Sequence, residues 1–261
     1  MSTSRTLFAV EGPVAFLTFN RPEARNAMTW EMYEALVAAC DRVDEADAVR
    51  VFVLRAEGGK AFIAGTDISQ FTRFASRDDA IAYERRIDGV IDRLERVSAA
   101  TVAQIEGVAT GGGCAIALAC DLRVCTPGAR FGVPIARTLG NCLSAANYAR
   151  LIDMIGPARV KDLLFTGRLV DATEAASLGL VTRMVDPSAI DAAVRELAAT
   201  IAANAPLTIL ATKEAVRRIQ ASRRIDPAQA DDLIAACYSS DDFKEGVAAF
   251  LAKRPPLFKG R

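Results

Sequence analysis

The sequence predicts an α/β fold, with a largely parallel sheet covered by helices in the first half and a helical C-terminal region after it. In the first half, strand-like runs alternate with helical segments, and helices that cross between strands usually mean a parallel sheet with covered faces. After Pro134 the pattern becomes mostly helical. Hydrophobic residues make up 51% of the 261 residues, which is enough for a large buried core.

The first half begins with a predicted hairpin and then repeats strands and helices. Leu7–Val10 and Val14–Phe19 flank Glu11-Gly12-Pro13, which is a turn signal. Thr29 is expected to cap one helix and Asp78 to open a second, because apolar residues follow both at helical spacing. The remaining strand-like runs are Val49–Arg55, Ala61–Asp67, Thr101–Ile105, Leu122–Cys125 and Ala129–Val133.

The second half is predicted to be helical, with one short strand at Val181–Val185. Pro187, Pro206 and Pro227 suit the first turn of helices, where the missing N–H has no partner in any case. We place a boundary near residue 200, between a core (1–200) and a helical C-terminal region (201–261) that packs on the core or on a neighbouring subunit. The predicted helices are Ser144–Ile155, Ala158–Phe165, Ala172–Leu178, Pro187–Ala203, Pro206–Gln220, Pro227–Cys237 and Asp241–Leu251.

The most informative stretch is Gly107–Asp121, in which three consecutive glycines, Gly111 to Gly113, open an apolar helical segment. Glycine lets a ligand atom approach the backbone, and the free N–H groups of a helix start favour negative charge. The stretch matches neither a P-loop nor a dinucleotide-binding pattern. Two interpretations stay open: a site for an anion or a developing oxyanion, and a glycine contact where a helix crosses a strand.

The composition excludes several functional classes. The 32 basic and 32 acidic residues cancel, so nothing directs the chain to nucleic acid or to an anionic membrane. The sequence has no histidine, which removes histidine triads and nearly all zinc sites, and no metal site is predicted. The six cysteines form no C-x-x-C pair, as expected for free thiols in a reducing cytoplasm. Met1–Val10 lacks a signal-peptide pattern, and the longest apolar segment is too short to span a bilayer.

Several segments, in order, resemble the crotonase (enoyl-CoA hydratase/isomerase) superfamily over nearly the whole chain. The resemblance implies a crotonase-like spiral of repeated ββα turns and a C-terminal helical region that builds homotrimers or dimers of trimers. It also implies an acyl-CoA thioester as substrate, with coenzyme A as part of that substrate and no separate cofactor. The matching segments are Asn20–Ala27, Ala61–Ile68, Gly107–Arg123, Phe131–Pro134, Gly167–Val181 and Phe243–Lys259.

In this family the thioester oxygen lies between two backbone N–H groups, and the resemblance places these at Thr66 and Gly112. Fixed donors at that oxygen would stabilise an enolate by roughly 3–4 kcal/mol each. Lys259, from this or a neighbouring subunit, would lie near the phosphates of coenzyme A, unless it is only a solvated surface charge. The positions implied to bind coenzyme A are Ala24, Arg25, Ala64, Gly65, Ile68, Gly111, Phe258 and Lys259.

The chain departs from the family at the two positions where its hydratases carry glutamates. One follows the triple-glycine-Cys and is Ala115, and the other follows the Phe-Gly-x-Pro and is Ile135. Hydration needs one group that activates water and one that moves a proton, and neither side chain can do this. We therefore expect ordinary enoyl-CoA hydration to be absent or very slow.

Other residues were weighed for the missing proton transfer. Cys142 near a helix start could be a thiolate of lowered pKa, with Arg137 as a nearby cation, but a small core residue is the favoured interpretation. Asp67 follows Thr66 and could be an acid or base, although the family pattern favours a structural role. Asp121 is interpreted as a structural anchor beside Arg123. Two hypotheses follow: an acyl-CoA enzyme of the lyase or isomerase class, and a catalytically silent acyl-CoA-binding oligomer.

Overall fold

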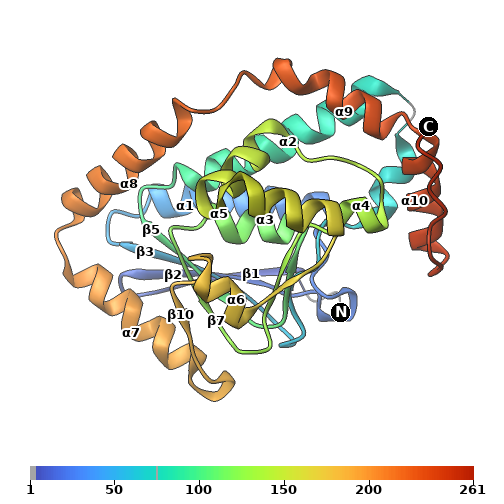
Figure 1. Cartoon of the computed structure of the whole chain (residues 1–261). Helices are drawn as coiled ribbons and strands as arrows, with labels where there is room; N and C mark the ends of the chain where they lie inside the picture. Colours follow the sequence, from blue (N-terminus) through green and yellow to red (C-terminus); the bar gives the residue numbers. More distant parts are fainter. Residues whose placement is uncertain (1–3, 75) are drawn as a thin grey trace.

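The chain folds into two sheets and a surrounding set of helices (Figure 1). The structure is a computed structural model that describes residues 4–74 and 76–261. Residues 1–3, which begin the segment analysed for a signal peptide, lie outside the described part. The strands are β1 (Thr6–Glu11), β2 (Val14–Phe19), β3 (Val51–Ala56), β4 (Ala61–Ile63), β5 (Ala100–Ile105), β6 (Val108–Thr110), β7 (Leu122–Cys125), β8 (Arg130–Gly132), β9 (Val170–Asp171) and β10 (Arg183–Met184).

Two sheets divide the strands between them. The six-stranded sheet has the order β1-β2-β3-β5-β7-β10, and only its β1–β2 hairpin is antiparallel. The four-stranded sheet has the order β4-β6-β8-β9, with β4, β6 and β8 parallel. Consecutive strands β3–β4, β5–β6 and β7–β8 therefore step from the first sheet to the second before the chain enters a helix. This repeated step is the predicted ββα rhythm.

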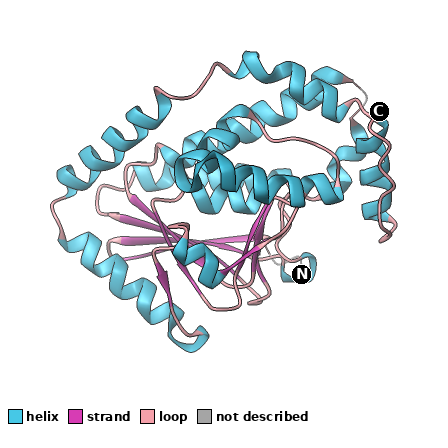
Figure 2. Ribbon diagram, viewed as in Figure 1, coloured by secondary structure: helices cyan, strands magenta, loops and turns pink. Residues whose placement is uncertain are grey.

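The helices enclose the sheets and then extend around them (Figure 2). Helices α1, α2, α3 and α5 cover one face of the six-stranded sheet and α7 covers the other, while α8 to α10 lead along the outside of the molecule (Figure 1). The α-helices are α1 (Trp30–Asp44), α2 (Arg77–Glu95), α3 (Gly112–Ala119), α4 (Ile135–Thr138), α5 (Ala145–Thr166), α6 (Ala172–Ser177), α7 (Ile190–Ala203), α8 (Pro206–Ala221), α9 (Asp231–Tyr238) and α10 (Asp241–Leu251), with short 3₁₀ turns η1 (Pro22–Ala24), η2 (Ile68–Arg73), η3 (Pro187–Ala189) and η4 (Pro227–Ala230).

Two hydrophobic clusters fill the layers, because alternate residues of the buried strands face opposite sides. Phe52 and Leu54 of β3 point into the main core with Met32 and Leu36 of α1. The neighbouring Val51 and Val53 point the other way, against Val194 and Leu197 of α7. The strand predicted at Val49–Arg55 is thus buried on both faces, as its continuous apolar run indicates.

The predicted helix starts and strands differ from the structure in three details. Thr29 is the N-cap residue of α1 as predicted, but its hydroxyl makes no cap hydrogen bond and accepts from Arg5 instead. Helix α2 begins at Arg77, one residue before Asp78, because Ser76 and Asp79 form a capping box. Strand β6 was missed inside the glycine-rich stretch, since three residues are too few to give a periodic signal.

Candidate active site

The loop that follows β4 and the triple glycine that opens α3 meet beside one cavity. The cavity has a volume of about 180 Å³. Ala64, Gly65 and Thr66 line it from the loop after β4, and Gly111 and Gly112 line it from the start of α3. A Cβ built on Gly111 would lie 3.5 Å from the Cα of Gly65, so the two backbones are in close contact. These two loops, which are far apart in the sequence, therefore form one wall of the cavity.

The backbone N–H groups of Thr66 and Gly112 are both left free at this wall. Hydrogen bonds on either side of Thr66 fix its loop: Met28 N donates to Gly65 O at 2.8 Å, and Asp67 N donates to Met28 O at 2.9 Å. Within the described chain, neither the Thr66 N–H nor the Gly112 N–H has an acceptor. A Cβ built on Gly112 would lie 3.9 Å from Thr66 N. Unpaired backbone donors are uncommon in folded proteins, so two beside one cavity need an explanation.

The glycines of the triplet have different surroundings, and both interpretations of the stretch apply to different residues. A Cβ on Gly113 would lie 2.1 Å from Ile63 O, so this glycine allows α3 to pack against β4. A Cβ on Gly112 would instead lie 2.6 Å from the hydroxyl of Tyr33 and 3.4 Å from that of Thr66. Gly112 therefore lets the start of α3 approach these buried hydroxyl groups, while the residue itself lines the cavity.

A cluster of three hydroxyl groups lies behind the free amides. The Thr66 hydroxyl is hydrogen-bonded to Tyr33 at 2.8 Å and to Tyr83 at 2.9 Å, and all three groups are buried. Burial raises the pKa of Tyr33 and Tyr83, so both phenols stay neutral. Sequence reasoning missed Tyr33, although a tyrosine on the apolar face of α1 indicates a hydroxyl directed into the core.

Apolar side chains occupy positions 115 and 135, where the sequence resemblance predicts glutamates in a hydratase. Ala115 and Ile135 both line the cavity, from α3 and α4. This part of the wall offers no ionisable side chain.

A glutamate that the sequence analysis did not single out lines the same cavity. Glu84 lies on the buried face of α2 and is 4% exposed. Its carboxylate accepts a short hydrogen bond from the hydroxyl of Tyr238 on α9, and Tyr238 also accepts one from Asn141 Nδ2 at 3.0 Å. Asn141 lines the cavity as well, and its buried Oδ1 has no hydrogen-bond partner. A sequence signal existed, because Glu84 interrupts the apolar stripe formed by Ala80, Ile81, Ile87 and Ile91.

The surroundings of Glu84 favour its neutral form. Burial raises the pKa of Glu84 to about 8, with a further upward contribution from the Asp88 carboxylate, while the hydrogen bond from Tyr238 acts in the opposite direction. Aromatic rings enclose the pair, with Phe71 5.0 Å from Tyr83 and Phe243 4.7 Å from Tyr238 between ring centroids. Among the residues the structure describes, Glu84 forms no ion pair with an arginine or lysine.

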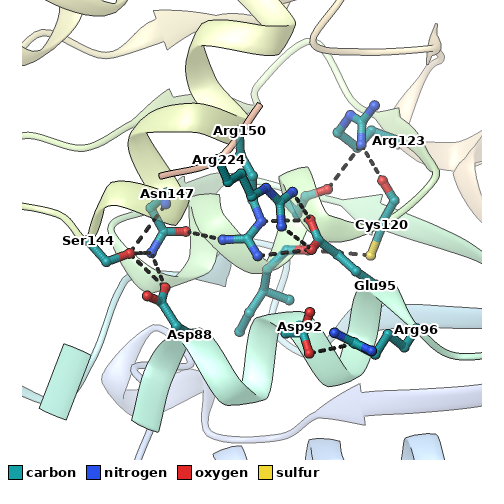
Figure 3. Close-up of polar contacts among 12 residues, drawn as sticks. Asp88, Asp92, Glu95, Arg96, Cys120, Arg123, Ser144, Asn147, Arg150 and Arg224 are labelled. Atoms are coloured by element: carbon teal, nitrogen blue, oxygen red, sulfur yellow. Dashed lines mark hydrogen bonds and ion pairs between the residues drawn. The ribbon is translucent and has the colours of Figure 1, made fainter. Parts of the chain in front are cut away.

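A second carboxylate on α2 has cations as its partners (Figure 3). Glu95 accepts hydrogen bonds from Arg150 at 2.6 and 3.0 Å and from Arg224 at 3.0 and 3.2 Å. Asn147 accepts from Arg150 at 3.1 Å and donates to Ser144, which donates to Asp88 at 2.6 Å. This network joins α2, α5 and the segment after α8 behind the cavity.

Comparison with known proteins places this geometry in a family. The family model described as enoyl-CoA hydratase/isomerase matches residues 9–261. The chain belongs to the enoyl-CoA hydratase/isomerase family. A short-chain-enoyl-CoA hydratase from Clostridium acetobutylicum is 32% identical over 262 residues, which cover 97% of each chain.

Solved structures of family members share the fold. A putative enoyl-CoA hydratase/isomerase family protein from Hyphomonas neptunium is 37% identical, with a TM-score of 0.78 and 99% and 98% of the two chains covered. A methylmalonyl-CoA decarboxylase complexed with 2S-carboxypropyl-CoA is 25% identical, with a TM-score of 0.88 and both chains fully covered. The predicted crotonase-like α/β fold is thereby confirmed.

Asp67, which was weighed as an acid or base, and Asp121, which was interpreted as a structural anchor, both hold structure. Asp67 accepts from Arg21 at 2.8 Å and from the Ser69 backbone at 3.1 Å, where it caps η2. Burial alone would raise the pKa of Asp67, but the hydrogen bonds from Ser69 and Arg21 outweigh it and hold the pKa below its usual value. Asp121 accepts from the Thr101 backbone at 2.7 Å and from Lys213 at 2.8 Å, rather than from the side chain of Arg123.

The hypothesis that Cys142 is a thiolate of lowered pKa was wrong. A hydrogen bond with Cys237 and burial raise the pKa of the Cys142 thiol, which is 7% exposed and lies 3.6 Å from Leu233 O. Arg137, the cation proposed beside it, is exposed and does not influence that pKa. Cys142 packs as a small core residue, and the neighbouring Asn141 and Leu143 line the cavity instead.

The residues expected to bind coenzyme A fall into two groups. Ala64, Gly65, Ile68 and Gly111 line the cavity. Arg25 O accepts from Ala64 N at 3.1 Å, which brings the Ala24–Arg25 turn against the cavity wall without lining it. The C-terminal pair lies elsewhere: the Lys259 backbone donates to Asp242 of α10 at 2.6 Å, and the Phe258 side chain is 37% exposed. In this single chain, Phe258 and Lys259 do not line the cavity, while Phe250 of α10 does.

Other features of the described chain are distinct from this cavity. A larger groove of about 520 Å³ separates α8 from the core, and the residues that line it include none of those predicted for the thioester site. The described residues contain no group of three or more histidine, cysteine, aspartate or glutamate side chains placed to hold a metal ion. No described helix is long and apolar enough to cross a bilayer.

Proposed function

We propose that this chain is an acyl-CoA enzyme that stabilises a thioester enolate between the backbone N–H groups of Thr66 and Gly112. The observation that carries the proposal is the pair of amides without acceptors, on two adjoining loops beside one cavity. Negative charge that develops on a thioester oxygen would be stabilised by such preorganised donors. Coenzyme A would enter as part of the substrate, in contact with the Arg25 turn and the Ala64–Gly65 backbone.

The reaction would differ from two-glutamate hydration. The C. acetobutylicum relative is named a hydratase, but Ala115 and Ile135 leave the corresponding positions here without a proton-moving group. Enolate chemistry that needs a single proton-moving group, such as proton transfer at the carbon next to the thioester, fits the cavity better than addition of water. We place the reaction in the lyase or isomerase class, in a cytoplasmic homotrimer or dimer of trimers whose helical C-terminal region (201–261) joins the subunits.

A panel of acyl-CoA thioesters tests the proposal. We expect the α-hydrogens of saturated acyl-CoA molecules to exchange with deuterated solvent in the presence of the protein, as followed by mass spectrometry. Crotonyl-CoA hydration should stay near background. If no thioester binds, or if crotonyl-CoA is hydrated at the rate of a two-glutamate enzyme, the proposal fails.

Gly112→Ala tests the amide wall directly. The added methyl would meet the Tyr33 hydroxyl at 2.6 Å and fill the space beside Thr66 N. We expect the exchange rate to fall by roughly 10²-fold or more, the scale seen when one oxyanion donor is lost. Gly128→Ala is the matched control, because a Cβ there meets nothing within 4 Å. Equal rates in the two folded variants would contradict the placement of the thioester.

The alternative is a catalytically silent acyl-CoA-binding oligomer, which the apolar Ala115 and Ile135 favour. It predicts tight binding of coenzyme A thioesters without exchange or turnover. The double change Ala115→Glu and Ile135→Glu should then create crotonyl-CoA hydration on an intact binding site. A folded double variant that binds but stays inert would show that these positions do not face the reacting carbon.

A further inference from the structure

We propose that Glu84 is the residue that moves the proton in this cavity, with Tyr238 and Asn141 positioning its carboxyl group. This inference rests on the proposed enolate chemistry and supplies the acid–base group that the sequence lacks at 115 and 135. Glu84 enters from α2, whereas those two positions lie on α3 and α4.

The position of Glu84 supports this role. Glu84 and Asn141 line the same cavity as Thr66 and Gly112. The residue before Glu84, Tyr83, is hydrogen-bonded to Thr66 at 2.9 Å, so this turn of α2 lies directly against the loop that bears one of the free amides. The Glu84 carboxylate also contributes to the raised pKa of Tyr33, whose hydroxyl is hydrogen-bonded to Thr66 at 2.8 Å. A charge on Glu84 therefore acts on the hydroxyl cluster that lies behind the free amides.

The polar surroundings of Glu84 also support this role. A structural buried carboxylate normally has a cation or several donors, because an ionised group without them is costly to bury. Glu84 accepts from the hydroxyl of Tyr238, which Asn141 in turn holds at 3.0 Å, and from the backbone N–H of Ser144, and neither donor is a cation. The buried Asn141 Oδ1 has no partner in the described chain, so the network is incomplete on the cavity side. A strongly perturbed carboxyl in a cleft is a physical indication of function.

The step balances in both directions. Ionised Glu84 removes a proton from the carbon next to the thioester carbonyl: that C–H bond breaks, an O–H bond forms on Glu84, and the electron pair moves to the thioester oxygen. Protonated Glu84 returns the proton to the same carbon, or to the conjugated carbon two bonds further along an unsaturated chain. The neutral form suits the enolate complex, because it places no second negative charge near the oxygen.

Burial and neighbouring groups also shift the pKa of the other titratable side chains near Glu84. Burial raises the pKa of Tyr33, Tyr83, Tyr148 and Tyr238, and the hydrogen bond with Cys237 raises that of Cys142. Asp88 lies one turn along α2, with Arg150 and Arg224 beyond it, and burial raises its pKa too. Cys237 needs a control, because the hydrogen bond from Cys142 lowers the pKa of its thiol to about 7.

The test compares the full-length wild type with Glu84→Gln, and with Glu45→Gln as an exposed matched control. Two quantities are measured: the α-hydrogen exchange rate of butyryl-CoA in deuterated buffer, and the Kd of coenzyme A by calorimetry. Loss of a general acid–base group lowers rates by roughly 10²–10⁴-fold, so Glu84→Gln should lose exchange by that factor while Kd stays nearly unchanged. Glu45→Gln should match the wild type.

A pH profile keeps the inference testable if Glu84→Gln folds poorly. Exchange in the wild type should rise with pH through about 8 as Glu84 ionises. Tyr238→Phe removes the hydrogen bond that lowers the pKa and should move the profile to higher pH, whereas Asp88→Asn removes a charge that raises it and should move the profile to lower pH. Cys237→Ala should leave the profile in place.

The outcomes separate the two proposals. Wild-type exchange that persists in folded Glu84→Gln, or a profile that neither Tyr238→Phe nor Asp88→Asn moves, overturns the role of Glu84 and leaves the enolate site standing. No wild-type exchange with any thioester overturns both.

Discussion

Two buried glutamates on the same helix show how surroundings decide what a carboxylate does. Glu84 and Glu95 both lie in α2, but α5 and the segment after α8 provide Glu95 with Arg150 and Arg224 (Figure 3). Burial alone would raise the pKa of Glu95, and the hydrogen bonds and charges of Arg150 and Arg224 outweigh this and lower it. Glu84 has a tyrosine in place of cations, so burial dominates and its pKa rises. The paired carboxylate holds helices together, while the unpaired one remains able to exchange a proton.

The largest expected effect on stability is at Glu95, the glutamate that is paired with arginines. Glu95→Gln would leave Arg150, with 5% of its side chain exposed, and Arg224, with 15% exposed, without the carboxylate that both contact. Removal of one partner of a buried ion pair costs about 3–5 kcal/mol. We expect the free energy of unfolding in urea to fall by that amount at neutral pH. A loss no larger than that of an exposed pair would show that the network contributes little.

Glu84→Gln should change stability in a way that depends on pH, because the pKa of Glu84 is raised whereas that of Glu95 is lowered. The pKa of Glu84 in the folded protein is about 8, above the usual 4.5, so its contribution is full below the usual value and is lost as the pH rises through 8. Glutamine cannot ionise, so the variant should be more stable relative to the wild type at about pH 9 than at about pH 5, by roughly 4 kcal/mol. Thermal unfolding at both pH values measures this, and parallel stability–pH curves would contradict the raised pKa.

Arg224→Met tests how far one arginine can support Glu95. The change removes two of the four hydrogen bonds to this carboxylate but leaves Arg150 in place. Hydrogen bonds to charged groups contribute about 1.5–3 kcal/mol, so we expect a loss of about 2 kcal/mol in the free energy of unfolding. The pKa of Glu95 should rise, and stability should fall sooner on acidification.

The control for that experiment is Arg218→Met, which removes an exposed arginine paired with Glu214 on the same helix. A surface pair of this kind contributes about 0–1 kcal/mol. Equal losses in Arg218→Met and Arg224→Met would remove the distinction between the network and a surface contact.

The smallest stability effect is expected for Tyr238→Phe. It removes one neutral hydrogen-bonded hydroxyl, worth about 1 kcal/mol, at a pH where Glu84 is protonated. Above about pH 8, where Glu84 is ionised, the cost should grow, because the lost hydrogen bond then involves a charged acceptor. Chemical denaturation at the two pH values checks this, and a cost independent of pH would contradict an ionising partner for Tyr238.

Much of the fold followed from local patterns, and the misses have physical causes. The hairpin at Gly12 and the helix break at Gly156–Pro157, where Gly156 has a φ of +76°, are local turn chemistry that a sequence displays directly. Strand β6 was missed because it is stabilised by its parallel neighbours β4 and β8 rather than by its own three residues. Thr29 has the predicted N-cap position of α1, but its hydroxyl is engaged by Arg5, a residue distant in sequence, rather than by the helix. The division at residue 200 and the oligomeric state stay predictions.

The sequence by itself determined the fold, the glycine-rich loop and the apolar residues at positions 115 and 135, because those features depend on backbone freedom and on residue type at fixed local spacing. It also carried an unread signal, a glutamate within the apolar stripe of α2. Only the tertiary structure decided that Glu84, rather than Asp67 or Cys142, lies at the cavity without a cation. Its partner Tyr238 lies 154 positions away, and a pKa depends on which groups surround a carboxyl in space, which no local pattern specifies.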